Sequence, residues 1–370
     1  MEKTIQLYVI IPVYNVERYI RRCFDSLCNQ DYEHVSFIII DDGSSDKSGE
    51  ICDEYALLDK RFIVKHINNH GVSYARNFGL QLLRNRGGYL TFVDPDDFLT
   101  DNSTYSNMAN YIMENGGCDL LKFGYNMVEE NGRLLKVISL SKCIQLYSNI
   151  LSKKEEIEQF YEYILFHKGI LGNSISASLW TSVFSNDIIC DNNILFDTNI
   201  SKAEDWLFCS DYLRYVKKIL LWNVCPYNYR INMNSTINTF YLETDIGVEK
   251  GNYIYKRLLE NILILEYSNK HKLKKYVYKL YISKAINYIV NSCDKRANLK
   301  ISEIYKRANN ILDDNYIRSN VKSLKIFDCV SLRDKIEYLL VKYKLSSLAI
   351  LYSCLIAHKR LYRLKMCKSK

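Results

Sequence analysis

The sequence is short of residues that interrupt secondary structure. Its 370 residues include only 3 Pro and 14 Gly. We find no internal repeat and no Pro/Gly-rich or low-complexity tract. These absences argue against a disordered or repeat protein and leave room for long helices. The chain is long enough for one large domain, or for one domain plus an appendage.

The sequence also lacks the cysteine patterns of metal sites and disulfide scaffolds. Its 12 cysteines include no C-x-x-C pair. Cys23, Cys52 and Cys209 lie among apolar residues, so buried reduced thiols are expected. The N-terminal stretch MEKTIQLYVIIPVYN has no secretory layout. We therefore expect a cytoplasmic protein.

Positive charge is unevenly spread along the chain. The formal net charge is +8, and residues 331–370 alone hold ten Lys or Arg against two acids. The remainder is close to neutral, which argues against a body that binds nucleic acid. A basic tail instead suggests an anionic surface, such as the cytoplasmic face of a membrane.

Short apolar runs alternate with helical patterns in the first hundred residues. The expected strands are 7–12, 35–40, 62–66 and 89–93. Helical stripes lie between them, and their short connections predict a parallel sheet flanked by helices. Residues 119–140 are interpreted as a hairpin with Asn131-Gly132 in a type I′ turn.

Polar clusters follow three of these strands. They are Tyr14-Asn15, residues 41–44 and residues 94–97. Ligands of open parallel sheets bind at the carboxyl ends of the strands, so the topology should gather these clusters on one rim.

The acidic stretch at 94–97 reads Asp-Pro-Asp-Asp. Asp94 and Asp96 are carboxylates one residue apart, and such a pair can hold a hard divalent cation. The alternative is a turn in which Asp97 merely caps the next helix. A D-x-D tripeptide alone does not decide between the two.

Together with its neighbours, this motif resembles glycosyltransferase family 2, the inverting enzymes of the GT-A fold. The matching stretches are VIIPVYNVERYI, FIIIDDGSSDKS, NNHGVSYARNFGL and YLTFVDPDDFL. They occur in order, and each follows a strand or opens a helix. The close resemblance covers residues 5–105, and a weaker match extends to residue 240.

The resemblance implies a nucleotide-sugar donor site, with a UDP-sugar as the first candidate. Residues 12, 14 and 15 would line the nucleobase pocket, with residue 17 nearby; in this sequence they are Pro12, Tyr14, Asn15 and Glu17. Asp42 would hydrogen-bond the base, and Asp41 would support the loop.

The resemblance also assigns the diphosphate side of the donor site. Arg76 would approach the nucleotide. Asp94 would reach the ribose or the metal, and Asp96 would coordinate Mn²⁺ or Mg²⁺, with Asp97 as a substitute ligand. Each of these residues also has a purely structural interpretation as a turn former or an ion pair.

A second acidic pair, Glu204-Asp205, opens a helical stripe. A carboxylate is electrostatically favoured at that position. In the family, the Asp of a similar pair is the general base that takes the proton from the acceptor hydroxyl, which implies that role for Asp205. Family members often have Gly before this pair, where this chain has Ala203. The alternative is an acidic helix start without chemistry.

Two further segments match the family more loosely. Residues 179–184 resemble a segment that usually carries Lys where Ser182 stands, and Tyr229-Arg230 resembles a stretch near the active-site flap. No Q-x-x-R-W, the signature of processive synthases, follows the D-x-D. Transfer of a single sugar is therefore expected.

The run 345–358 contains 14 uncharged residues between basic flanks. A bilayer span needs about 20 apolar residues, so the run is short for a crossing. An interfacial helix and a core helix with a solvated basic end both stay open. Family members often act on lipid-linked acceptors, which implies a peripheral membrane contact through residues 331–370.

The sequence thus predicts a GT-A catalytic domain over residues 1–245 and a mainly helical region over 246–370. The expected reaction is inverting transfer of one sugar to an acceptor hydroxyl in polysaccharide or lipid-linked oligosaccharide biosynthesis. One alternative is a polyprenyl-phosphate sugar synthase, whose anionic acceptor needs no base. Another is a non-catalytic scaffold that binds nucleotide sugars.

Overall fold

The computed structural model describes residues 4–166, 177–200, 202–231, 245–265, 267–268, 270–329 and 331–368. The chain divides into two compact units, residues 1–233 and 234–370. The sequence-based boundary at 245 stays a prediction, because residues 232–244 lie outside the described part.

The first unit is built on one mixed sheet. Among the described residues its strands are β1 Leu7–Val13, β2 Val35–Asp41, β3 Phe62–His66, β4 Tyr89–Phe92, β5 Phe98–Leu99, β6 Leu120–Val128, β7 Leu134–Ile138, β8 Ile150–Leu151, β9 Ser182–Ser185 and β10 Ile219–Arg230. Their order is β3-β2-β1-β4-β9-β6-β10-β5, with β7 beside β6 and β8 beside β10.

The parallel strands end on a common rim. β1 is parallel to β2 and β4, and β2 is parallel to β3. β9 is antiparallel to both β4 and β6, so β6 and its parallel neighbour β10 run the same way as β1. The chain order reverses between β1 and β4, which is where sheets of this kind bind ligands. The predicted α/β fold is confirmed.

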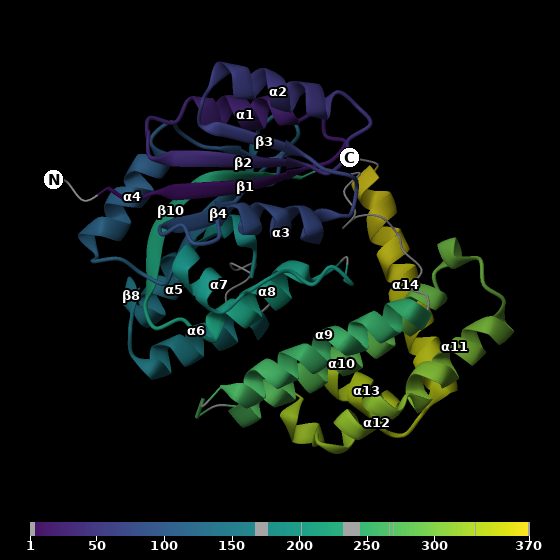
Figure 1. Ribbon diagram of the computed structural model, residues 1–370. Helices are drawn as coiled ribbons and strands as arrows, with labels where there is room; N and C mark the ends of the chain where they lie inside the picture. Colours follow the sequence, from purple (N-terminus) through teal and green to yellow (C-terminus); the bar gives the residue numbers. More distant parts are fainter. Residues whose placement is uncertain are drawn as a thin grey trace. The chain divides into compact units, whose positions relative to one another are not determined.

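Helices cover both faces of this sheet. They are α1 Ile20–Cys28, α2 Ser48–Leu58, α3 Val72–Leu82, α4 Thr104–Glu114, α5 Ser141–Tyr147, α6 Lys154–Phe166, the 3₁₀ turn η1 Leu179–Thr181, α7 Asn186–Asp191 and α8 Glu204–Leu213. α1 and α2 lie on one face and α3 on the other (Figure 1). All seven residues of β1 are buried, so both faces need this cover.

A glycine lets α3 approach the sheet closely. A Cβ on Gly79 would lie 2.9 Å from the side chain of Ile10 in β1. A larger residue would therefore push the helix outward. This contact sets the depth of Arg76, which lies one turn earlier on α3.

The hairpin of β6 and β7 is present, but the predicted type I′ turn is wrong. That turn needs positive φ at both central residues, and here Gly132 has a φ of 90° whereas Asn131 does not have a positive φ. Gly132 N–H donates to the Glu129 carbonyl at 2.8 Å. Arg133 Nε donates to the Glu129 carboxylate at 2.9 Å. The connection between the strands is therefore longer than a two-residue turn.

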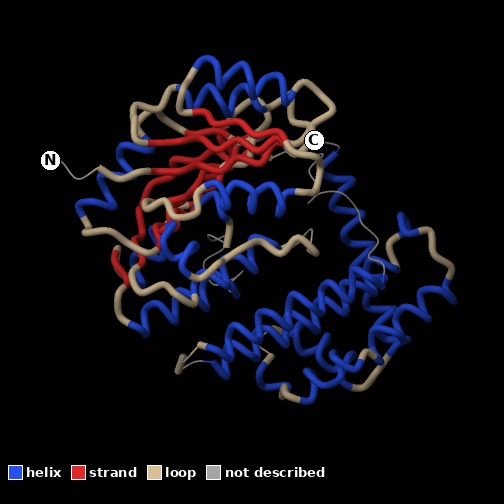
Figure 2. Tube along the Cα trace, viewed as in Figure 1, coloured by secondary structure: helices blue, strands red, loops and turns tan. Residues whose placement is uncertain are grey.

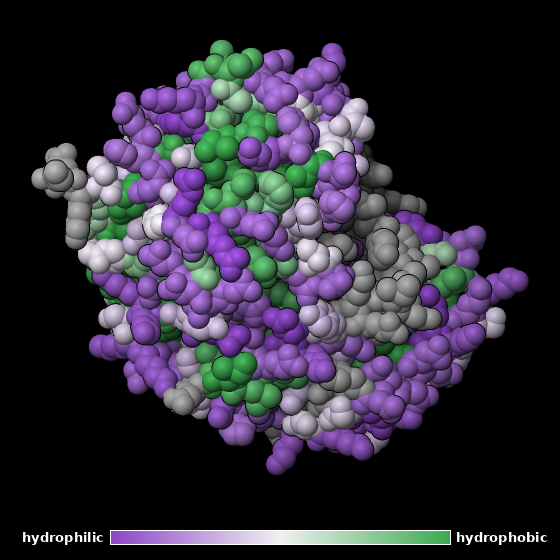
Figure 3. All heavy atoms as spheres, in the orientation of Figure 1, coloured by the Kyte–Doolittle hydropathy of each residue, from purple (hydrophilic) through white to green (hydrophobic). Residues whose placement is uncertain are grey.

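The described residues of the second unit contain helices and no strands (Figure 2). They are α9 Asp245–Ile264, α10 Lys270–Ser292, η2 Lys295–Ala297, α11 Ile301–Asp313, α12 Asn315–Lys322, η3 Ile326–Asp328, α13 Leu332–Lys342 and α14 Ser346–Lys368. The predicted helical C-terminal region is confirmed. No helix within the described ranges is long and apolar enough to cross a membrane. Hydrophilic residues dominate the molecular face in Figure 3.

Candidate active site

Two loops bond to each other where β1 and β2 end. Asn15 Oδ1 accepts from the backbone N–H of Ser45 at 2.8 Å, and Asn15 has a positive φ of 49°. Glu17 Oε2 accepts from the backbone N–H of Lys47 at 2.9 Å. These two side chains therefore shape the rim, whether or not they also touch a ligand.

Asp41 is a buried carboxylate at the end of β2. One oxygen accepts from Ser44 N–H at 3.1 Å, and the other lies 2.8 Å from His66 Nδ1. The carboxylates of Asp41 and then Asp53, which accept hydrogen bonds from the imidazole, raise the pKa of His66. Asp41 thus holds the loop after β2 to the end of β3, in keeping with a supporting role.

Asp42 fixes the loop that leads into α3. Its two carboxylate oxygens accept from the N–H groups of His70 at 2.8 Å and Gly71 at 2.7 Å. The predicted bond from Asp42 to a nucleobase stays a prediction. Of the other residues expected around the base, Pro12 is buried in β1, whereas Tyr14 is 50% exposed and accessible to a ligand.

An open hollow of about 420 Å³ lies beside this loop. Its lining residues are His66, Ile67, Asn68, His70 and Tyr74. They come from the end of β3 and the start of α3, so the hollow is at the same rim as the polar clusters.

Arg76 joins the two acidic motifs. Its Nη1 donates to Glu204 Oε1 at 3.0 Å, and its Nη2 lies 3.4 Å from Asp94 Oδ1. The guanidinium is 5.4 Å from the centroid of the Phe196 ring, and the residue is only 7% exposed. Removing one partner of a buried ion pair typically costs about 3–5 kcal/mol. Arg76 therefore connects α3, the end of β4 and the start of α8.

The acids at 94–97 differ in what surrounds them. Asp97 is 1% exposed and accepts from the Tyr227 hydroxyl at 2.7 Å and from Arg230 N–H at 2.8 Å. Asp96 is half-buried, and apart from its own backbone N–H its carboxylate has no hydrogen-bond partner within the described ranges. Burial, followed by the nearby charge of Asp94, raises the pKa of Asp96 to about 6. The side-chain oxygens of this motif that accept from no other described residue are therefore those of Asp96 and the second oxygen of Asp94, whose Oδ1 pairs with Arg76.

Asp205 lies at the first turn of α8. Its Oδ1 accepts from the N–H of Trp206 at 2.7 Å, which orients the carboxylate. Burial is the largest cause that raises its pKa to about 6, and the charge of Glu204 is the second; Arg76 opposes both. A carboxylate with this pKa is ionised at neutral pH and still basic enough to accept a proton.

The residue before the acidic pair has an unfavourable backbone conformation. Ala203 is the N-cap of α8 and lies in the left-handed region, with a φ of 64° and a ψ of 22°. Such a conformation costs an L-residue about 1–2 kcal/mol, whereas Gly adopts it freely. This explains the preference for Gly that the resemblance implies.

We expect Ala203→Gly to raise the free energy of unfolding by about 0.5–1 kcal/mol, because the relief of strain exceeds the added chain entropy. Urea denaturation measures it. The matched control is Ala56→Gly in the right-handed helix α2, which should lower the free energy by about 1 kcal/mol. Equal destabilisation by both changes would contradict this explanation.

The carboxylates of this site suit a divalent cation that binds together with a phosphate-bearing ligand. No group of three or more His, Cys, Asp or Glu side chains in the described ranges is arranged to hold an ion. Asp94 and Asp96 instead offer two carboxylates. Mg²⁺-type sites commonly use one or two carboxylates and take further oxygens from substrate phosphates and water. The residues present fit such a site.

Three residues of this region gave weak sequence signals. The Tyr227 hydroxyl accepts from the N–H of Asp94 at 3.1 Å as well as donating to Asp97. Arg230 is 5% exposed, and its Nε and Nη2 have no hydrogen-bond partner among the residues that the structure describes. Lys122 is buried in β6. In the sequence, only its charge inside the apolar run LLKFG distinguishes it.

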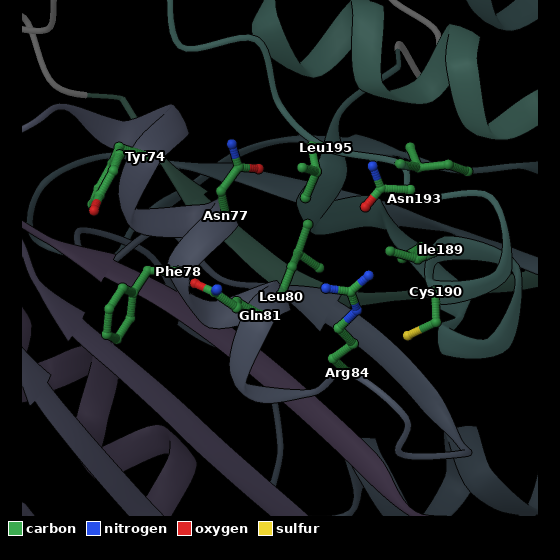
Figure 4. A pocket seen from close by; sticks show the side chains of 11 residues that line it. Tyr74, Asn77, Phe78, Leu80, Gln81, Arg84, Ile189, Cys190, Asn193 and Leu195 are labelled. Atoms are coloured by element: carbon green, nitrogen blue, oxygen red, sulfur yellow. The ribbon is translucent and has the colours of Figure 1, made fainter.

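A separate cavity of about 210 Å³ lies between α3 and the segment that contains α7 (Figure 4). Phe78, Leu80, Ile189 and Leu195 supply much of its apolar lining. None of the acids described above lines it. This cavity is therefore distinct from the acidic rim.

Comparisons with known proteins give consistent results. Residues 8–171 match the model of the family described as glycosyl transferase family 2. The chain is 31% identical over 227 residues to EpsJ of Bacillus subtilis (strain 168), an uncharacterized glycosyltransferase, covering 61% of each protein. It is 29% identical over 222 residues to the glycosyltransferase GlyA of Streptococcus pneumoniae, covering 54% of this chain and 31% of GlyA. Less than two thirds of either relative is therefore spanned.

A third relative is the minor teichoic acid biosynthesis protein GgaB of Bacillus subtilis (strain 168), 39% identical over 109 residues, which cover 29% of this chain and 12% of GgaB. Among solved structures, S. aureus TarS 1-349 in complex with UDP-GlcNAc gives a TM-score of 0.62 at 16% identity. It covers 97% of this chain and 92% of that chain. This likeness shows the fold.

Proposed function

The chain belongs to glycosyl transferase family 2 through residues 8–171, and on that premise we propose that it transfers one sugar from a nucleoside diphosphate sugar to an acceptor hydroxyl, with inversion at the anomeric carbon. The observation that carries the proposal is the cluster centred on Arg76. Its ion pairs with Asp94 and Glu204 connect the D-x-D stretch to the Glu204-Asp205 pair, which supports a shared site.

Asp94 and Asp96 would hold Mn²⁺ or Mg²⁺ beside the donor diphosphate. Such an ion supplies positive charge that stabilises the departing nucleoside diphosphate. Arg76 keeps Asp94 oriented and adds its own buried positive charge. Asp97 contributes indirectly, because its bonds to Tyr227 and to the Arg230 backbone fix the stretch that carries Asp96.

Asp205 is the general base of the proposed reaction. The acceptor oxygen forms a bond to the anomeric carbon while the bond from that carbon to the diphosphate oxygen breaks. The hydroxyl proton passes to the Asp205 carboxylate, which the N–H of Trp206 orients. Alignment of the two reactants in one crevice accounts for part of the rate.

The relatives suggest which substrates to test first. TarS was solved with UDP-GlcNAc and GgaB is named for teichoic acid biosynthesis. These facts support a UDP-sugar donor and an acceptor in the assembly of a cell-surface polysaccharide. The hollow beside Tyr74 offers space for a nucleobase at the same rim.

A donor panel tests the proposal. The protein is incubated with UDP- and GDP-sugars in Mn²⁺, Mg²⁺ or EDTA, with a membrane lipid extract as the source of acceptor, and released nucleoside diphosphate is measured. We expect release from one donor that EDTA abolishes. No release from any donor would contradict the proposal and favour a scaffold that binds nucleotide sugars without turnover.

A peripheral membrane contact through α14 also belongs to the proposal. Ala349, Ser353 and Ala357 are buried on one face of this helix. The opposite face exposes a stripe of leucines, namely Leu348 at 53%, Leu351 at 59% and Leu355 at 66%. Exposed lysines lie at both ends of this stripe, at positions 359 and 344, the second of which pairs with Asp313. An apolar stripe between cations suits the interface of an anionic bilayer.

We expect the triple change Leu348→Ser, Leu351→Ser and Leu355→Ser to reduce binding to phosphatidylglycerol vesicles more than about tenfold, because each buried leucine contributes about 1.5–3 kcal/mol. Co-sedimentation measures it. Changing Leu57 and Leu58, which are 90% and 77% exposed on α2, to Ser is the control and should leave binding unchanged. Wild-type protein that stays in the supernatant, or forms dimers through this stripe, would contradict the membrane contact.

A further inference from the structure

A lysine lies in the interior of the sheet. Lys122 is on β6 and is 1% exposed. The strand register pairs it with Ser182 on β9. Burying an ammonium is costly, and desolvation lowers the pKa of Lys122 to about 8. A lysine at a buried position therefore needs an explanation beyond packing.

The ammonium holds the turn that precedes β9. Lys122 Nζ donates to Thr181 Oγ1 and Ser182 Oγ, both at 2.7 Å, and to the Ser178 carbonyl at 3.3 Å. The two hydroxyls donate in turn to the Ser178 carbonyl, at 3.2 Å and 2.9 Å. An ammonium has three N–H donors for these three oxygens, whereas a neutral amine or amide nitrogen has only two. The turn therefore favours the charged form of Lys122, and this charge can act on other buried groups.

The same turn packs against the helix that carries the proposed base. Cys209 Sγ donates to the carbonyl of Ala177, the residue before the turn, at 3.2 Å. Asp205 lies four residues before Cys209 and thus on the same face of α8. The charge of Asp205 is among the causes that raise the pKa of Lys122. The turn thus connects Lys122 to the helix that begins with Asp205, and the charges of the two residues act on each other.

We infer that Lys122 is a positioning residue for the transfer reaction: it fixes residues 178–182 against α8 and supplies the buried positive charge that favours the ionised form of Asp205. This inference rests on the proposed role of Asp205 as base. The other charged groups that act on Asp205 are Glu204 on α8, Arg76 on α3 and Asp94 after β4. Glu204 and Asp94 favour the protonated carboxyl and Arg76 opposes them; in this inference, Lys122 acts in the same direction as Arg76.

The test separates the charge from the hydrogen bonds. Lys122→Gln keeps a donor but removes the charge, and the double variant Lys122→Ser with Ser182→Lys moves the charge to the paired strand. We expect Lys122→Gln to lower kcat at least about tenfold, to leave the donor KM within about twofold and to shift the acidic limb of the pH–rate profile upward. The double variant should recover kcat to within about threefold of the wild type.

Thermal melting is measured on each variant, and Lys122→Gln should melt within about 2 °C of the wild type. A wild-type kcat and pH profile in Lys122→Gln would overturn the inference. So would a loss of kcat that accompanies a large drop in melting temperature and is not recovered by the double variant, since that pattern marks a purely structural lysine. A wild-type protein without donor turnover would overturn the proposed function and this inference with it.

Discussion

Asp205→Asn should lower kcat about a thousandfold, since general bases typically contribute 10²–10⁴-fold and the amide cannot accept the acceptor proton. The binding of UDP should stay within about threefold, because Asp205 contacts neither Asp94 nor Asp96 through a hydrogen bond. The change removes a negative charge without removing volume, and the amide oxygen can still accept from Trp206. The measurement is the steady-state rate of transfer, with UDP affinity determined by calorimetry.

The pH dependence of the wild type gives an independent check of this role. The pKa of Asp205 is raised to about 6 by burial and then by Glu204, so the base is protonated and inactive below that pH. The rate should therefore rise as the pH increases through 6 and level off above it. Full activity of Asp205→Asn would instead favour a polyprenyl-phosphate sugar synthase, whose phosphate acceptor is already an anion.

The second large effect should distinguish the roles of two adjacent acids, Asp96 and Asp97. Asp96→Asn should weaken metal-dependent donor binding at least about a hundredfold and leave stability nearly unchanged, because its half-buried carboxylate has free oxygens. Asp97→Asn should lower the free energy of unfolding by about 1–3 kcal/mol, since Tyr227 and the Arg230 N–H donate to different carboxylate oxygens and the amide replaces one of them with an NH₂ that cannot accept.

Calorimetric titration with UDP and Mn²⁺ measures the first effect, and urea denaturation measures the second. The two variants are matched in chemistry and differ by one position in the chain. If Asp97→Asn lost metal-dependent binding at wild-type stability while Asp96→Asn kept it, the ligand assignment would be reversed.

Much of the fold could be predicted because it depends on local patterns. Buried parallel strands are short apolar runs, and β3 begins and ends where the sequence places it, at residues 62 and 66. The turn at Asn131-Gly132 could not be predicted in the same way. Its geometry depends on the Arg133–Glu129 ion pair and on a register shift near Val128, which are properties of the folded hairpin.

The candidate site, like the fold, could be predicted only in part. The topology rule predicts that the clusters after β1, β2 and β4 share a rim, and the pairings of these strands place them there. The Arg76–Glu204 ion pair and the burial of Asp97 against Tyr227 were not predictable, because each involves residues more than 100 positions apart in the chain. Ser182 is a similar case, since its ammonium partner comes from the neighbouring strand at Lys122.

The most direct test of the central claim is a calorimetric titration of the wild-type protein with UDP in Mn²⁺ and in EDTA, with Asp96→Asn alongside. If the acidic rim is the donor site of a family 2 glycosyltransferase, UDP should bind the wild type with Mn²⁺ and lose at least about a hundredfold in affinity in EDTA and in the variant. Binding of UDP that neither EDTA nor Asp96→Asn weakens, or no binding at all, would contradict the assignment of this rim as the donor site.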